Sequence, residues 1–155
     1  MKLTAKGRYA VTAMLDISIH QTGDPVSVLD IANRQSISPA YLEQIVGQLK
    51  RAGMLSSRKG PGGGYELGAD AQDITISDIV AAVGEGVDVT RCGGRADCLE
   101  GHVCLTHNLW AELSDEIDGF LQSISLATLV ARHQANPVTP EAAGDTDQRI
   151  SATLI

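Results

Sequence analysis

Apolar residues recur at helical spacing from the start of the chain. Within "GRYAVTAMLDISIH", residues 7–20, Ala10, Met14 and Ile17 fall at positions i, i+4 and i+7, so one face of a helix would be apolar. A second, shorter helix is predicted to begin after Ser27, because serine is a favoured N-cap residue. The chain therefore opens with two amphipathic helices joined by the turn "TGDP".

The third predicted helix has clear boundaries. Ser38 is a good N-cap, Pro39 suits the first helical position, and Gly53 marks the end. Its apolar stripe consists of Leu42, Ile45, Val46 and Leu49. Its opposite face carries polar side chains long enough to reach a base edge or a phosphate, namely Tyr41, Gln44, Gln48 and Arg51.

Two short strand patterns follow the third helix, joined by "GPGGG" at residues 60–64, and they predict a β-hairpin. A phosphate-binding P-loop would need Lys-Ser or Lys-Thr after its last glycine, but Tyr65 and Glu66 follow here. Three helices and then a hairpin is the order of a winged helix-turn-helix. In that motif the third helix enters the major groove of DNA.

This order makes the third helix and the hairpin tip candidates for DNA contact. Gln44 can pair with adenine, and Glu43 can accept a hydrogen bond from cytosine. Basic residues at the hairpin tip can enter the minor groove or bind phosphates. A solvated helix face and a solvated turn are the alternatives. The candidate DNA-binding residues are Ser38, Tyr41, Glu43, Gln44, Gln48, Arg51, Arg58, Lys59, Gly60 and Pro61.

The charge of the chain is unevenly distributed. The net charge of −7 argues against nucleic acid at first. However, residues 1–64 carry eight Lys/Arg against four Asp/Glu, a net of +4, while residues 65–155 carry four against fifteen, a net of −11. Phosphate binding depends on the local surface rather than the total, so the first half remains the candidate DNA-binding region.

The second half of the chain predicts further helices. One is capped by Thr75 and ends at Gly84, and a long one covers residues 106–124. The long helix has a narrow apolar seam that suits association between two copies of the chain. The seam consists of Leu109, Leu113, Ile117, Phe120, Leu121 and Ile124.

These patterns predict a mainly α fold with a small β-hairpin wing. Residues 1–70 would form a winged helix-turn-helix DNA-binding region. Residues 71–133 would hold a metal-binding loop at 88–107 and a dimerisation helix at about 107–124. Residues 134–155, polar and without periodicity, predict a flexible tail.

All three cysteines lie in "RCGGRADCLEGHVCLTH", residues 91–107. Zinc sites usually hold their ligands in tight knuckles, whereas gaps of five residues suit a binuclear iron–sulfur cluster, which takes four protein ligands. His102 competes with His107 as the fourth ligand, and the start of the long helix favours His107. The candidate ligands are Cys92, Cys98, Cys104 and His107.

Several other classes of protein find little support in the sequence. The chain has no run of about eighteen apolar residues, so no membrane span is predicted. No signal peptide is expected either, which predicts a cytoplasmic location where thiols stay reduced. An odd number of cysteines also disfavours a disulfide framework. A thiol oxidoreductase would need C-x-x-C, which is absent, and no catalytic pattern predicts an enzyme.

Together these features resemble the iron–sulfur cluster regulators of the Rrf-type family of bacterial winged-helix transcription factors. The resemblance covers residues 1–131. It is carried by "MKLTAKGRYAVTAMLDI", "SPAYLEQIVGQLKRAGMLSS", "GPGGGYEL", "RCGGRADCLEGHVCLTH" and "LWAELSDEI".

The resemblance implies a homodimer that binds double-stranded DNA and receives a [2Fe-2S] cluster from the cluster assembly machinery. It implies that Cys92, Cys98, Cys104 and His107 bind the cluster. It also implies that the loaded protein represses the operon encoding cluster assembly, while the cluster-free form still binds a second class of DNA sites.

Rival assignments exist within and outside the family. The nitric-oxide-sensing members bind a [4Fe-4S] cluster with a carboxylate near the N-terminus, but here Arg8 lies in that region and no acid precedes Asp16. The cysteine-metabolism repressors lack the three cysteines. Lys59 departs from the family pattern of arginine, and lysine cannot make a bidentate contact. Outside the family, the alternative is a metal or cluster carrier without specific DNA binding.

Overall fold

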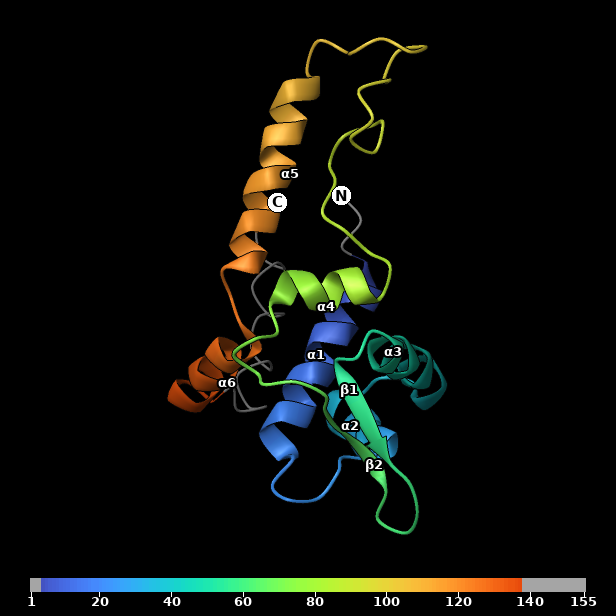
Figure 1. Cartoon of the computed structure of the whole chain (residues 1–155), viewed down its shortest axis with the longest axis vertical. Coiled ribbons are helices and arrows are strands. Elements are labelled where there is room, and N and C mark those ends of the chain that lie inside the picture. Colours follow the sequence, from blue (N-terminus) through green and yellow to red (C-terminus); the bar gives the residue numbers. More distant parts are fainter. Residues whose placement is uncertain (1–3, 138–155) are drawn as a thin grey trace, which may run out of the picture.

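The computed structural model describes residues 4–137. It contains helices α1 to α6 and a two-stranded antiparallel hairpin, which confirms the predicted winged-helix class (Figure 1). Residues 138–155, most of the predicted tail, lie outside the described residues, whereas positions 134 and 135 belong to α6. No helix in the described part of the chain is long and apolar enough to cross a membrane.

The helix-turn-helix is built from α1 (Ala5–His20), α2 (Val28–Gln35) and α3 (Pro39–Arg51). Ser27 caps α2 as predicted, since its hydroxyl accepts a hydrogen bond from the amide of Asp30 at 3.1 Å. Ser38 occupies the N-cap of α3, but its side chain makes no capping hydrogen bond. The predicted apolar stripes meet in one core that includes Ala10, Met14, Ile17, Leu42, Ile45, Val46 and Leu49, each fully buried.

The wing consists of β1 (Leu55–Arg58) and β2 (Gly64–Leu67), paired from Leu55–Leu67 to Arg58–Gly64. Two hydrogen bonds between the backbones of Val26 and Tyr65, of 2.9 and 2.8 Å, attach it to the turn before α2. A Cβ at Gly64 would lie 2.4 Å from the carbonyl oxygen of Val26. Only glycine therefore allows the wing to approach this closely.

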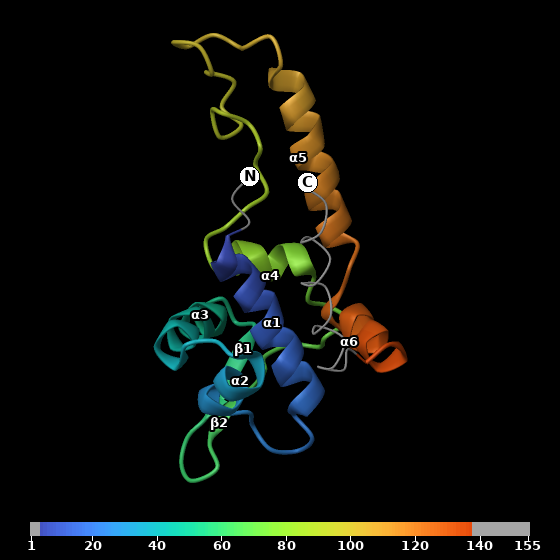
Figure 2. The same cartoon turned by 180° about the vertical axis from the view of Figure 1, so that it is seen from behind.

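The remaining helices are α4 (Ile76–Ala82), α5 (His107–Gln122) and α6 (Leu126–Ala135). Thr75 and Asp78 form the predicted capping box of α4. Figures 1 and 2 show α5 projecting away from the core, with the loop that follows α4 running beside it. The tip of this loop and the tip of the wing lie at opposite ends of the molecule.

The predicted apolar seam of α5 is largely open to solvent in one chain. Leu109, Leu113 and Phe120 are 57%, 41% and 62% exposed. Ile124 was wrongly assigned to this seam: it lies beyond the end of α5, where the chain turns back, and it is buried in the core. The exposed side chains leave a hydrophobic helix face without a partner among residues 4–137.

Candidate metal centre and nucleic-acid interface

The loop after α4 is fixed by short-range hydrogen bonds before it reaches the first cysteine. The carboxylate of Asp88 accepts hydrogen bonds from the amide and the hydroxyl of Thr90, at 2.7 and 2.6 Å. The same hydroxyl accepts one from the amide of Gly94 at 2.7 Å. On the other side, the amide of Val89 donates to Ser114 on α5 at 3.0 Å. The segment that carries Cys92 is therefore anchored to itself and to α5.

Three of the predicted ligands converge at the start of α5. The ligand atoms of Cys92, Cys98 and His107 all lie within 4.8 Å of one another. Nδ1 of His107 is 3.5 Å from Sγ of Cys92 and 3.3 Å from Sγ of Cys98. Cys92 and His107 are buried. Residues fifteen positions apart in the sequence thus share one small, shielded space.

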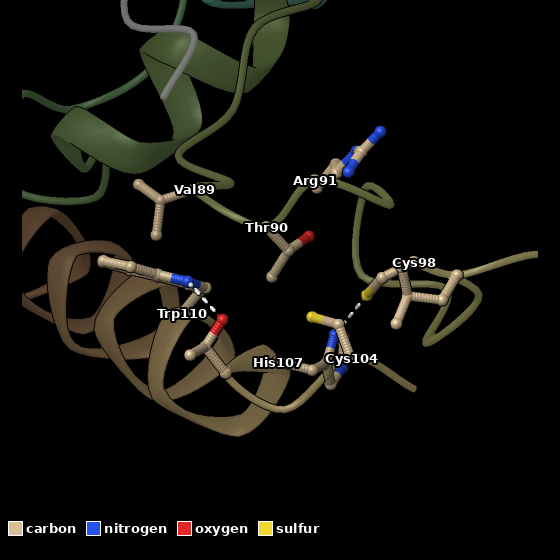
Figure 3. Close-up of a pocket in the computed structure, with 9 residues that line it drawn as sticks. Val89, Thr90, Arg91, Cys98, Cys104, His107 and Trp110 are labelled. Carbon is tan, nitrogen blue, oxygen red and sulfur yellow. Dashed lines mark hydrogen bonds between the residues drawn. The ribbon is translucent and has the colours of Figure 1, made fainter. Parts of the chain in front are cut away.

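Cys104 faces the same space from the other side. It lines a cavity of about 320 Å³ together with Cys98, His107 and Thr90. In Figure 3 the sulfur of Cys98 points toward the imidazole of His107 and the sulfur of Cys104 points into the cavity, whereas the side chain of Arg91 points away. This volume is several times the roughly 30 Å³ that a water molecule occupies. The cavity therefore has room for more than one metal ion.

The three thiols differ in the direction in which their pKa values are shifted. Burial opposes the thiolate of Cys92, but hydrogen bonds with Cys98, with Thr90 and with the backbone of Ala96 and Asp97 outweigh it and lower its pKa to about 6. A hydrogen bond from the Cys98 thiol likewise lowers the pKa of Cys104. A backbone hydrogen bond favours the Cys98 thiolate, but burial and the two neighbouring sulfurs outweigh it and raise the pKa of Cys98. Two of the three cysteines, Cys92 and Cys104, thus have a pKa below the ordinary value for a thiol, which promotes the thiolate, the form that binds metals.

The donor set fits a transition metal or an iron–sulfur cluster. Thiolate and imidazole are ligands for zinc, iron and their clusters, whereas magnesium and calcium prefer oxygen. The rival histidine, His102, is exposed and lies in a tight turn whose backbone pairs with Leu99. The first acidic residue of the chain, Asp16, is buried and its carboxylate is bound by Arg34, so it is not available as a metal ligand.

The candidate DNA-binding residues of α3 lie at its beginning and along its outer face. Ser38, Glu43, Gln44 and Arg51 are exposed. Tyr41 packs its ring edge-on against Tyr9 of α1, with centroids 6.0 Å apart and planes at 80°. Gln48 is half-buried, and its side-chain oxygen is buried without a hydrogen-bond partner in residues 4–137. Gln48 and the half-buried Tyr41 are therefore less accessible to DNA than the four exposed residues of this group.

The tip of the wing exposes the other candidates. Arg58, Lys59, Gly60 and Pro61 are all exposed. Nη2 of Arg58 lies 2.6 Å from Oε1 of Glu66 on the neighbouring strand. Sequence reasoning missed this acidic partner, although a diagonal pair across a short hairpin could have suggested it. Glu66 brings a negative charge next to the predicted phosphate contacts.

Comparison with known proteins places the chain in a family. The family described as "Rrf2: Iron-dependent Transcriptional regulator" matches residues 3–132. The chain belongs to the Rrf2 family. It is 50% identical over 151 residues to the HTH-type transcriptional regulator IscR of Photobacterium profundum, covering 97% of this chain and 86% of that protein. Against the IscR of Photorhabdus laumondii the identity is 56% over 130 residues, with coverages of 84% and 79%.

Solved structures give the same result. T. potens IscR superposes with a TM-score of 0.72 at 30% identity, covering 92% of this chain and 96% of that one. CymR, the global cysteine regulator of B. subtilis, gives a TM-score of 0.74 at 30% identity, with coverages of 85% and 98%. These relatives are transcriptional regulators and not enzymes. The Rrf2 chain described here is likewise a DNA-binding transcription regulator.

Proposed function

We propose that this protein is an iron–sulfur cluster-sensing regulator that represses the genes for cluster assembly when it is loaded. A [2Fe-2S] cluster would be held by Cys92, Cys98, Cys104 and His107. When bound, such a cluster supplies a redox-active centre whose presence reports the cluster supply of the cell. The protein would act in the cytoplasm and receive the cluster from the assembly machinery.

One observation carries this proposal. The thiols of Cys98 and Cys104 and the imidazole of His107 line a single cavity beside the start of α5, and the ligand atoms of Cys92, Cys98 and His107 lie within 4.8 Å of one another. Hydrogen bonds from Val89 to Ser114 and from Gly94 to Thr90 hold the backbone on either side of Cys92, which keeps its thiol near the other candidate ligands. The IscR-named relatives support the same cofactor class.

A homodimer is part of the proposal. The exposed face of α5 displays Leu109, Leu113 and Phe120, which a second copy would cover. Burying an apolar surface of this kind is a main driving force for association. Two copies would also present two recognition helices, as paired DNA half-sites require.

Anaerobic loading of the full chain with iron and sulfide tests the proposal. We expect two irons and two sulfides per chain, a visible absorption spectrum, and sequence-specific binding to DNA upstream of cluster assembly genes. His107→Ala should give a more labile cluster, whereas the matched variant His102→Ala of the same loop should keep the lifetime of the original protein.

The outcomes separate the proposal from its rivals. Four irons per chain and a response to nitric oxide would favour a nitric-oxide-sensing relative. Cluster binding without specific DNA binding, in both the loaded and the cluster-free form, would favour a carrier. Zinc alone at the cysteines would contradict the cofactor.

A further inference from the structure

The carboxylate of Glu85 binds the beginning of α1, 78 to 81 positions away in the sequence. The amides of Thr4 and Gly7 both donate to Oε2 of Glu85 at 3.0 Å, and the hydroxyl of Thr4 donates to the other oxygen. Amides in the first turn of a helix have no acceptor within the helix. A negative charge at this end is also favoured by the helix dipole. Glu85 thus serves as a remote cap of α1.

The contact is reciprocal, because α1 also caps the end of α4. Nζ of Lys6 donates to the carbonyl oxygen of Val83, the C-cap of α4, at 2.6 Å. Gly84 has φ +73°, which turns the chain back, and the amide of Glu85 bonds to the carbonyl of Val80 at 3.2 Å. The beginning of α1 therefore receives the negative charge of Glu85, and the end of α4 receives the positive charge of Lys6. The backbone of Glu85 is fixed where α4 ends.

Glu85 is also the first anchor of the segment that leads to the cysteines. Cys92 follows seven residues later. Between them, Val89 is bound to α5 through Ser114, and the Thr90 hydroxyl lies 3.8 Å from Sγ of Cys92. A change in the position of Cys92 would displace residues 85–92, a short segment that is hydrogen-bonded to α1 at Glu85 and to α5 at Val89. Its first tie to the DNA-binding region is the carboxylate of Glu85.

The beginning of α1 also contacts α3, the predicted recognition helix. Tyr9 lies two residues after Gly7 and packs edge-on against Tyr41, in the first turn of α3. Further along, α1 and α3 share the same core of fully buried side chains. Close-packed interiors transmit displacements rather than absorb them. The beginning of α1 is thus in contact both with Glu85, three residues before the metal-binding loop, and with the candidate DNA-binding surface.

We propose that Glu85 is the positioning residue that couples occupancy of the cysteine site to DNA binding. Loading of the site fixes residues 85–92 and strengthens the hold of Glu85 on the first turn of α1, whereas the unloaded loop holds it less tightly. A ligand shifts an equilibrium only through such a difference between two states. This inference rests on the proposed function, since it takes the cysteine site as the sensor and DNA as the output.

The test compares Glu85→Gln and Glu85→Ala with Glu100→Gln, which changes an exposed carboxylate of the same loop. For each full-length protein, DNA affinity is measured with and without the cluster, and hydrogen exchange of residues 4–9 is followed in both forms. In the original protein we expect the two affinities to differ at least about fivefold, and loading to slow exchange at residues 4–9. Glu100→Gln should behave identically.

The Glu85 variants should keep the visible spectrum and the iron content, while the ratio of the two affinities falls toward one and exchange no longer responds to loading. A merely structural role would lower both affinities equally and leave their ratio unchanged, which would overturn the inference. Exchange in the original protein that ignores loading would also overturn it.

Failure of the proposed function looks different. It would appear in the original protein as absent cluster or absent specific DNA binding. The exchange measurement does not depend on DNA, and it can be made with Zn²⁺ as the probe ligand of the same thiols if no cluster forms. The coupling between the cysteine site and α1 is then still decided by whether loading slows exchange at residues 4–9 and whether Glu85→Gln abolishes that effect.

Discussion

The guanidinium of Arg34 donates two hydrogen bonds to the buried carboxylate of Asp16. Nε lies 3.1 Å from Oδ2 and Nη2 lies 2.6 Å from Oδ1, while the side-chain amide of Gln35 donates to Oδ2 at 2.7 Å. Asp16 belongs to α1, and both donors belong to the last turn of α2. These bonds fix the angle between α1 and α2, two of the three helices of the helix-turn-helix.

Removing the carboxylate should therefore destabilise the fold. Asp16→Ala leaves Arg34 and Gln35 without their acceptor, and we expect the free energy of unfolding to fall by about 3 kcal/mol. Urea denaturation monitored by circular dichroism measures it. Asp24→Ala, in the exposed turn after α1, is the control and should change stability by less than about 0.5 kcal/mol. Equal effects of the two substitutions would contradict this role.

The same carboxylate predicts a dependence on pH. Burial raises the pKa of Asp16, but hydrogen bonds from Arg34 and Gln35 and the nearby positive charge outweigh it, so the pKa lies below the ordinary 3.8. A lowered pKa in the folded state favours the ionised form. Its contribution is complete above pH 3.8 and is lost as the pH falls through the folded-state value. Thermal unfolding of the original protein and of Asp16→Asn should converge in strong acid but not at neutral pH.

The helices could be predicted from the sequence because their signals are local. Thr75 and Asp78 lie three residues apart and form the expected capping box. Contacts between distant residues leave no such signal. Asp16 was visible only as an acid within an apolar stretch, and nothing near it in the sequence identifies Arg34 as its partner. Ile124 was misassigned because helical spacing continues past the end of α5.

For the metal centre, the sequence could indicate the candidate ligands but not their chemical state. Cysteine and histidine spacing identified the ligands as candidates, and the structure brings Cys92, Cys98 and His107 together. The spacing could not indicate which thiols favour the ionised form, because that depends on hydrogen bonds within the folded loop. It also could not reveal Glu85, since a glutamate that caps a helix about 80 positions away looks like any other loop acid.

Trp110 should report on the metal site. It is the single tryptophan of the chain and lines the cavity with Cys98 and Cys104. Its indole is held by a 3.1 Å hydrogen bond to Thr106. Iron–sulfur clusters absorb at the wavelengths where tryptophan emits, so loading should quench the fluorescence strongly. Cys98→Ala should abolish quenching together with the visible spectrum, and unquenched emission from a fully loaded protein would contradict this placement.

Lys59 should act as a phosphate contact at the exposed wing tip. Lys59→Ala should weaken DNA binding and reduce the slope of log affinity against log salt by about 0.9, the value for one lost phosphate contact. Fluorescence anisotropy at several salt concentrations measures this slope. Arg95→Ala, in the cysteine loop, whose tip lies at the opposite end of the molecule from the wing (Figure 1), is a control of equal charge. An unchanged slope for Lys59→Ala would remove this residue from the DNA-binding surface.

Glu66 forms an ion pair with Arg58 at the wing, and we expect its removal to affect DNA binding in the opposite direction to the removal of Lys59. The two side chains are 30% and 52% exposed, and exposed ion pairs contribute little to stability. Their effect on DNA binding should be larger, because Glu66 neutralises Arg58 and would itself lie near phosphates. Its removal both frees a cation and eliminates a repulsion.

Glu66→Gln should therefore strengthen DNA binding and steepen its salt dependence by up to about one counterion, with unfolding free energy unchanged within about 0.5 kcal/mol. Anisotropy titrations and urea denaturation give the two quantities. The double variant Glu66→Gln with Arg58→Ala separates the causes: if the gain comes from freeing Arg58, it disappears in the double variant, and if it comes from relieved repulsion, it persists. Weaker binding by Glu66→Gln alone would mean that the pair holds Arg58 in the position that DNA requires.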